Sequence, residues 1–150
     1  MTNALRTPND YEWLIYSLAE RFPIIRHSTL RFIRLGATLA RVTGELYFAQ
    51  DIRMVVRQRI LYHRLPALID DYGYEIWRGD EKIYWYDAQP HPDDPGLQST
   101  HPHHKHVPPD IKHNRVPAPT LSFTQPNLPA LIREIETMLT LLERNKSGRD

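Results

Sequence analysis

Apolar residues recur at helical spacing in two parts of the chain. The first run predicts a helix over residues 9–21, begun by Asn9 or Asp10 and ended by Pro23, with an apolar face of Trp13, Leu14, Leu18 and Phe22. The second predicts a helix after Asn127, with an apolar stripe of Leu128, Leu131, Ile132, Ile135, Leu139 and Leu142. The polar residues 145–150 are expected to fray.

Between these helices, apolar and polar residues alternate with a period of two. In 38–48 the apolar positions are Ala40, Val42, Gly44, Leu46 and Phe48; in 52–62 they are Ile52, Met54, Val56, Ile60 and Tyr62, opposite Arg53, Arg57 and Arg59. A helix over 52–61 also fits, but β-branched residues and the preceding turn favour a strand. We predict that the two stretches pair antiparallel and bury Val42, Leu46, Met54 and Val56.

Two further strands are expected over 70–77 and 82–87, joined by a turn at 78–81. Strands that follow one another through short turns form an antiparallel sheet. The pattern therefore predicts one α+β domain over residues 1–150, with a curved antiparallel sheet of about five strands and a helix on each side of it in the chain.

Residues 88–126 break the pattern, because they hold nine of the 13 prolines and six of the eight histidines. Proline fixes φ and removes a backbone donor, which argues against a regular helix or a central strand here. It also lowers the entropy lost on ordering. We expect an ordered loop that lies over the sheet and carries the functional site, with 97–115 bringing histidines close to Asp87 or His91.

Composition narrows the class of protein. The 150 residues include no cysteine, which excludes disulfides, thiolate metal sites and a cysteine nucleophile. No apolar run approaches the roughly 20 residues of a membrane span, and the first residues lack a signal-peptide layout, so a cytoplasmic protein is expected. The net charge of +1 conceals +5 over residues 1–64, −6 over 65–95 and +2 beyond. The basic part favours an anionic partner such as RNA or an acidic protein.

The histidine-rich segment is compatible with three interpretations, of which the first is metal binding. Histidines two residues apart share one side of an extended chain. The candidate zinc or iron ligands are His91, His101, His103 and Asp87, with His104 and His106 as a second pair. A tightly held structural zinc is not expected, since such sites close with four ligands that are often thiolates. No cofactor is therefore predicted, although a divalent metal stays compatible with the segment.

The second interpretation is metal-free cleavage of a phosphodiester. That reaction requires a base for the 2′-hydroxyl proton, an acid for the leaving oxygen and positive charge at the phosphate. His104 and His106 are candidates for base and acid. The candidate phosphate-binding residues are Lys105, Lys112, His113, Arg115, Arg57 and Arg59.

The third interpretation is structural. Histidines flanked by prolines can pack on aromatic rings and bind backbone carbonyls, so that they hold the loop and do no chemistry. The aromatic run Tyr84–Tyr86 is likewise more typical of a sheet core than of a base-stacking platform. The arginines at 41, 53, 57 and 59 are more typical of a solvated face, which is still compatible with RNA binding.

Several of these segments resemble the TumE family of small bacterial and archaeal proteins. The resemblance rests on YWYDAQPHP, on THPHHKHVPP with IKHNR behind it, and on QPNLPALIREIE; it covers about residues 28–144 and leaves out the helix at 9–22. The family's hallmark residues fall on Tyr86, Asp87, His103, His104, Lys105 and His106, which makes them the candidate catalytic residues. The resemblance implies a growth-inhibiting toxin that a cognate antitoxin protein neutralises. A metal-independent ribonuclease follows only by analogy with other small toxins, and a metal-dependent hydrolase or a non-enzymatic binding domain stays open.

Overall fold

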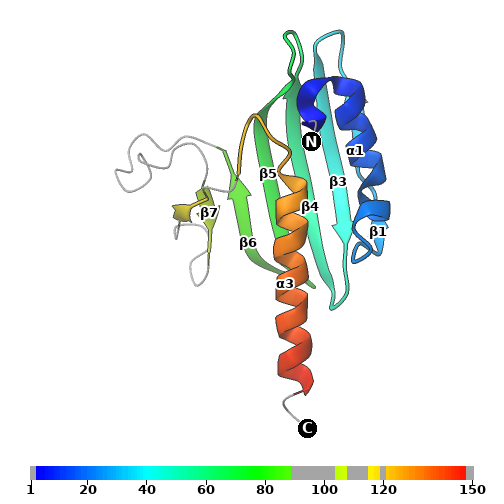
Figure 1. The fold of residues 1–150 in the computed structure, drawn as a ribbon. Helices are drawn as coiled ribbons and strands as arrows, with labels where there is room; N and C mark the ends of the chain where they lie inside the picture. Colours follow the sequence, from blue (N-terminus) through cyan, green and yellow to red (C-terminus); the bar gives the residue numbers. More distant parts are fainter. Residues whose placement is uncertain (1–2, 89–103, 108–114, 119–120, 148–150) are drawn as a thin grey trace.

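An antiparallel sheet with two helices on one of its faces makes up the computed structural model, which describes residues 3–88, 104–107, 115–118 and 121–147 (Figure 1). The elements in chain order are η1 (Ala4–Arg6), α1 (Pro8–Arg21), β1 (His27–Ser28), β2 (Arg31–Arg34), β3 (Leu39–Tyr47), β4 (Ile52–Leu61), β5 (Leu68–Arg78), β6 (Glu81–Asp87), β7 (His104–His106), β8 (Arg115–Pro117) and α3 (Leu128–Ser147). This is the α+β class that the sequence predicts. In the described residues no helix is long and apolar enough to cross a membrane.

The strands follow one another across the sheet in the order β1-β3-β4-β5-β6-β7-β8, and β2 also pairs with β3. β1 and β2 occupy the same edge, opposite different parts of β3, so that they form one interrupted edge strand. Gly44 lies at the interruption with φ +139°, where a Cβ atom would stand 2.6 Å from the carbonyl oxygen of Thr29. A glycine is required because only a bare backbone allows this close approach.

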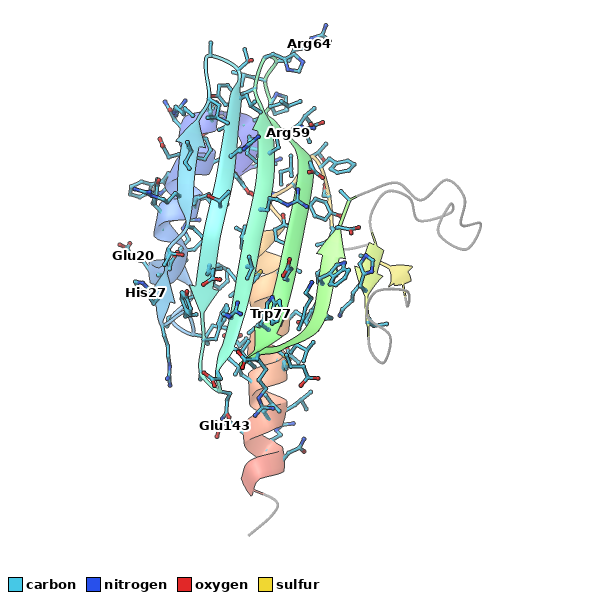
Figure 2. All side chains as sticks on the ribbon, turned by 180° about the vertical axis from the view of Figure 1, so that it is seen from behind. Glu20, His27, Arg59, Arg64, Trp77 and Glu143 are labelled. Atoms are coloured by element: carbon cyan, nitrogen blue, oxygen red, sulfur yellow. The ribbon has the colours of Figure 1, made fainter. Side chains whose placement is uncertain are left out.

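The central pair of strands is the one expected from the two-residue period. β3 and β4 run antiparallel with Leu46 opposite Met54 and Gly44 opposite Val56. The side chains of Val42, Leu46, Met54 and Val56 are 0–2% exposed. The alternative prediction of a helix over residues 52–61 is therefore wrong. Both helices lie on this buried face (Figure 1), whereas the other face of the sheet has neither helix in front of it (Figure 2); we call the latter the open face.

The N-terminal helix is confirmed, but its cap differs from the prediction. α1 begins at Pro8, and Thr7 accepts a hydrogen bond from the Asp10 backbone nitrogen at 3.1 Å. Pro8 suits the first helical position because it has no N–H to satisfy. Asn9 is therefore inside the helix, where its Oδ1 accepts a hydrogen bond from Arg34 at 2.7 Å.

α3 begins after Asn127 as predicted and continues to Ser147, further than the fraying at residue 145 that the sequence suggested. The side chain of Asn127 forms hydrogen bonds with residues outside α3. Its Oδ1 accepts from the Ser122 nitrogen at 2.8 Å, and its Nδ2 donates to the Tyr74 hydroxyl at 3.1 Å. Asn127 thereby joins the start of α3 to the sheet.

A buried polar chain continues from Asn127 through the core. Gln58, which interrupts the apolar row of β4, is 1% exposed. Its Nε2 donates to the Tyr74 hydroxyl at 2.6 Å, and its Oε1 accepts from the Tyr11 hydroxyl at 2.7 Å. Four elements (α1, β4, β5 and the start of α3) are thus linked by hydrogen bonds that satisfy the buried polar groups.

Two short stretches of the segment 88–126 belong to the sheet as β7 and β8, whereas most of the predicted loop over 97–115 lies outside the described residues. β7 pairs with β6, and β8 pairs with β7. The sheet therefore has more than the five strands predicted. Proline in β8 is accommodated because that strand is at the edge of the described sheet, where one row of backbone groups needs no partner strand.

Candidate active site on the open face of the sheet

Successive residues at the end of β6 face opposite sides of the sheet, as a period of two requires. Tyr86 is 3% exposed and lies under α3, where its hydroxyl donates to the Glu134 carboxylate, 2.7 Å from Oε2. Asp87 lines a hollow on the open face instead. The candidate residues Tyr86 and Asp87 therefore belong to different surroundings.

The same alternation separates the residues of β7. His106 is opposite Trp85, and its Nε2 is 3.2 Å from Asp87 Oδ2. Its ring centre is 4.3 Å from that of Trp85. His106 is only 2% exposed, whereas the Asp87 side chain is 19% exposed. The Asp87 side chain is thus the more exposed of the two and lines the hollow, whereas the imidazole is buried.

Lys105 takes part in a separate cluster on the helix side of the sheet. Its Nζ is 3.2 Å from Glu134 Oε1 and 4.2 Å from the centre of the Tyr84 ring. Glu134 also accepts the hydrogen bond of Tyr86. Burial, and next the hydrogen bond to Glu134, raise the pKa of Tyr86 well above its usual value, so its hydroxyl stays a donor. These contacts attach β7 to α3.

The hollow beside Asp87 is shallow and has a volume of about 260 Å³. Its lining comes from β4, β5 and β6 and consists of Val55, Arg57, Gly73, Glu75, Lys82, Trp85, Tyr86 and Asp87. Tyr86 is thus part of the lining, although its hydroxyl is bound to Glu134. Gly73 is opposite both Arg57 and Asp87 in the sheet. A Cβ atom on Gly73 would stand 2.6 Å from Arg57 Nη2, so the guanidinium lies directly over the bare backbone of β5. The absence of a side chain at Gly73 thus makes room for the guanidinium of Arg57 in the hollow.

Two cations lie at this hollow. Arg57 is held by Asp71, with Nη1 2.7 Å from Oδ2. Lys82 Nζ is 3.7 Å from Glu75 Oε1 and 3.8 Å from the centre of the Trp85 ring. Trp85 is thereby contacted by both Lys82 and His106, which leaves it poorly placed to stack on a base.

The neighbouring part of the open face is also basic. Arg59 is bound to Asp70, and its side chain is about half exposed. Figure 2 shows Arg59 and Trp77 on this face. The guanidinium carbon of Arg53 lies 4.9 Å from the centre of the Trp77 ring, and Trp77 Nε1 donates a hydrogen bond to Glu75. The arginines of β4 are therefore solvated and ion-paired, and they remain accessible to an anion.

Several candidates lie outside the described residues, namely His91, His101, His103, Lys112 and His113. For His104 and Arg115 the backbone position is defined: their Cα atoms are opposite Asp87 and His106, respectively. Within the described ranges, no group of three or more His, Cys, Asp or Glu side chains could hold a metal ion. Of the candidate set, the structure brings together Asp87, His106 and Arg57.

Sequence reasoning missed four contributors to these two clusters: Glu134, Gly73, Lys82 and Glu75. Glu134 lies at the border of the apolar stripe of α3, where a polar side chain can reach a partner on the sheet. The other three take part only because the register of β5 and β6 places them side by side, and no pattern along the chain shows that register.

Comparison with known families identifies the family to which the chain belongs. A family model of a toxin of toxin–antitoxin modules matches residues 15–139. The model is that of toxin TumE, and the chain belongs to this family. An antitoxin is therefore its implied partner. The match begins inside α1, so the N-terminal helix is partly included, contrary to the boundary suggested by the resemblance. Comparison with curated proteins and with solved structures gave no match.

Proposed function

We propose that the protein is a growth-inhibiting toxin that cleaves RNA without a metal, at the hollow beside Asp87. The observation that carries the proposal is the placement of the Asp87 carboxylate. It lines a hollow that also contains two cations, Arg57 and Lys82, and His106 holds it from the buried side. A carboxylate beside fixed positive charge is suited to phosphodiester transfer.

In this reaction the Asp87 carboxylate accepts the proton of a ribose 2′-hydroxyl. The 2′-oxygen bonds to phosphorus, a 2′,3′-cyclic phosphate forms, and the bond to the 5′-oxygen of the next nucleotide breaks. Arg57 and Lys82 stabilise the negative charge on the pentacoordinate phosphate. His104, whose Cα is opposite Asp87, is the candidate acid that protonates the leaving oxygen.

His106 is a positioning residue in this scheme, because its burial keeps it from the substrate. Its contact with Asp87 Oδ2 fixes the position of the carboxylate. Lys105 and Tyr86 lie on the other face and attach β7 to α3. Arg59 lies on the same strand as Arg57 and is available to contact neighbouring phosphates of the RNA.

The decisive experiment incubates the purified full-length protein with a single-stranded RNA in the presence of a chelator. Cleavage with 2′,3′-cyclic phosphate ends is expected, and the 2′-O-methylated RNA of the same sequence should stay intact. Asp87→Asn should lower the rate by about 10²–10⁴ because an amide cannot act as the base. Asp80→Asn is the matched control, since this carboxylate is exposed in the turn between β5 and β6 and does not line the hollow. No cleavage by the wild type, or equal rates for both variants, would refute the proposal.

A growth assay links the chemistry to toxicity. Expression without the antitoxin should arrest growth, and His106→Gln should relieve the arrest. His63→Gln, an exposed histidine in the turn between β4 and β5, is the control. A relief of toxicity by His106→Gln counts only if the thermal midpoint stays near that of the wild type, which separates lost positioning from lost folding.

A further inference from the structure

Four arginines lie in two neighbouring rows of the open face. Arg31 of β2, Thr43 of β3 and Arg57 of β4 are consecutive partners, and this row continues through Gly73 to Asp87. In the row beside it, Arg41 of β3 is opposite Arg59 of β4. The arginines therefore run across the strands toward the proposed cleavage site.

A second hollow of about 260 Å³ lies in this part of the face, next to the first. It is lined by Arg41, Thr43, Arg57, Gln58, Arg59 and Asp71. Arg57 lines both hollows. We call these two neighbouring hollows, together with the arginines beside them on β2, β3 and β4, the groove.

The four arginines differ in how their charge is balanced. Arg57 and Arg59 have carboxylate partners in Asp71 and Asp70. Arg31 and Arg41 are exposed, and within the described ranges neither forms an ion pair. The positive charge of the groove is therefore least compensated at the end away from Asp87, where a long anion would extend beyond the reacting phosphate.

We propose that these arginines, Arg31, Arg41, Arg57 and Arg59, form a track that binds the backbone of single-stranded RNA next to the cleavage site. The proposal rests on the ribonuclease function above and names its substrate. Adjacent strands are about 4.8 Å apart, so the four steps from β2 to β6 span roughly 19 Å, room for several nucleotides. The two rows of arginines are neighbours on the same strands, so they can contact a single backbone from both sides. An unpaired strand can also rotate its 2′-oxygen into line with the leaving oxygen, whereas a duplex restrains it.

The test measures binding of a 2′-O-methylated single strand, which the proposed reaction cannot cleave. The variant Arg31→Gln/Arg41→Gln should bind about tenfold more weakly than the wild type. The slope of log K against log salt should fall by about 1.4, because each phosphate contact on a single strand contributes about 0.7. The control Arg21→Gln/Arg144→Gln removes the same charge from exposed positions of α1 and α3. It should bind as the wild type does at moderate salt, and a duplex of the same sequence should bind more weakly to all three proteins.

Equal affinities of the Arg31/Arg41 variant and the wild type would overturn the track, as would an equal loss in the control variant. If the Arg31/Arg41 variant binds RNA normally but escapes neutralisation by the antitoxin, the arginines belong to a protein interface and the track is likewise wrong. Binding needs no cleavage, so the two proposals fail separately. RNA that is bound through these arginines but never cut would refute the ribonuclease and keep the track.

Discussion

Lys105 and His106 are adjacent in the sequence, yet their side chains contact opposite faces of the sheet. Lys105 binds Glu134 of α3 at 3.2 Å, and His106 binds Asp87 at 3.2 Å on the open face. The strand pairing of β7 with β6 causes this division, because Lys105 is opposite Tyr86 and His106 is opposite Trp85. These two neighbouring residues therefore make separate contacts, one that attaches β7 to the helix and one that supports the hollow.

The first prediction concerns the attachment. Lys105→Met should lower the free energy of unfolding by about 0.2–1 kcal/mol, since the ion pair with Glu134 is partly exposed and screened. Growth inhibition should persist, because Lys105 lies away from Asp87. Glu134→Gln should behave alike, and a double-mutant cycle measured by urea unfolding should show that the two residues are coupled. A Lys105→Met protein that folds with full stability but is no longer toxic would assign Lys105 to the chemistry.

Much of the sheet could be predicted from the sequence because its long strands alternate regularly. Only one choice of face for each strand buries Val42 and Leu46 on one strand together with Met54 and Val56 on the next. β7 and β8 have three residues each, too few to establish a period among prolines. Their pairing depends on the edge of β6, which is a property of the folded sheet.

The candidate site was predictable in part for the same reason. Asp87 and His106 stand out as residue types, but their chemical roles depend on which of them is buried. The burial of His106 follows from its place opposite Trp85, and the hollow follows from Gly73 lying between Arg57 and Asp87. Such relationships between strands have no counterpart in local sequence.

The second prediction concerns the polar chain through the core. Gln58→Leu should destabilise the protein by about 1–3 kcal/mol, because the Tyr11 hydroxyl loses its acceptor in a fully buried place. Adding Tyr11→Phe should recover part of this loss, since no hydroxyl then remains to be satisfied. Urea unfolding of the single and double variants measures both effects. A double variant whose loss is the sum of the two single losses would show that the residues act independently.

The third prediction concerns alkaline pH. Burial raises the pKa of Tyr74 above its ordinary value of 10.0, although hydrogen bonds from Asn127 and Gln58 act in the opposite direction. Burial also raises the pKa of Tyr11. The unfolded chain therefore releases these protons at lower pH than the folded protein does. Stability should be fully present below about pH 10 and fall as the pH rises above it.

Unfolding free energies between about pH 8 and pH 11, with phenolate absorbance recorded in parallel, test this dependence. The buried phenols should ionise only together with unfolding. Tyr72→Phe should make the decline less steep, because burial also raises the pKa of Tyr72 in the folded protein. A stability that stays constant across this range would contradict the assignment of these phenols as buried and protonated.

The last prediction uses Gly73 to separate the hollow from the fold. In Gly73→Ala the new Cβ would meet the end of the Arg57 side chain at 2.6 Å, and a flexible guanidinium can move away. The protein should therefore fold with nearly unchanged stability, while the added methyl group narrows the hollow and displaces its cation. The rate of RNA cleavage should fall at least as much in Gly73→Ala as in Arg57→Gln, the variant that measures the loss of Arg57 alone.

Gly44→Ala is the matched contrast. There the Cβ would meet backbone atoms of Thr29 and Leu30 at 2.6–2.8 Å, and φ is +139°, so neither the neighbour nor the residue can adjust. The backbone strain should lower the free energy of unfolding of this variant by roughly 1–3 kcal/mol. Displacement of the edge strand should lower it further. Gly73→Ala should thus lower the cleavage rate and leave the thermal midpoint nearly unchanged, whereas Gly44→Ala should lower the thermal midpoint. If Gly73→Ala keeps both its stability and the wild-type cleavage rate, the hollow beside Asp87 is not where the substrate binds.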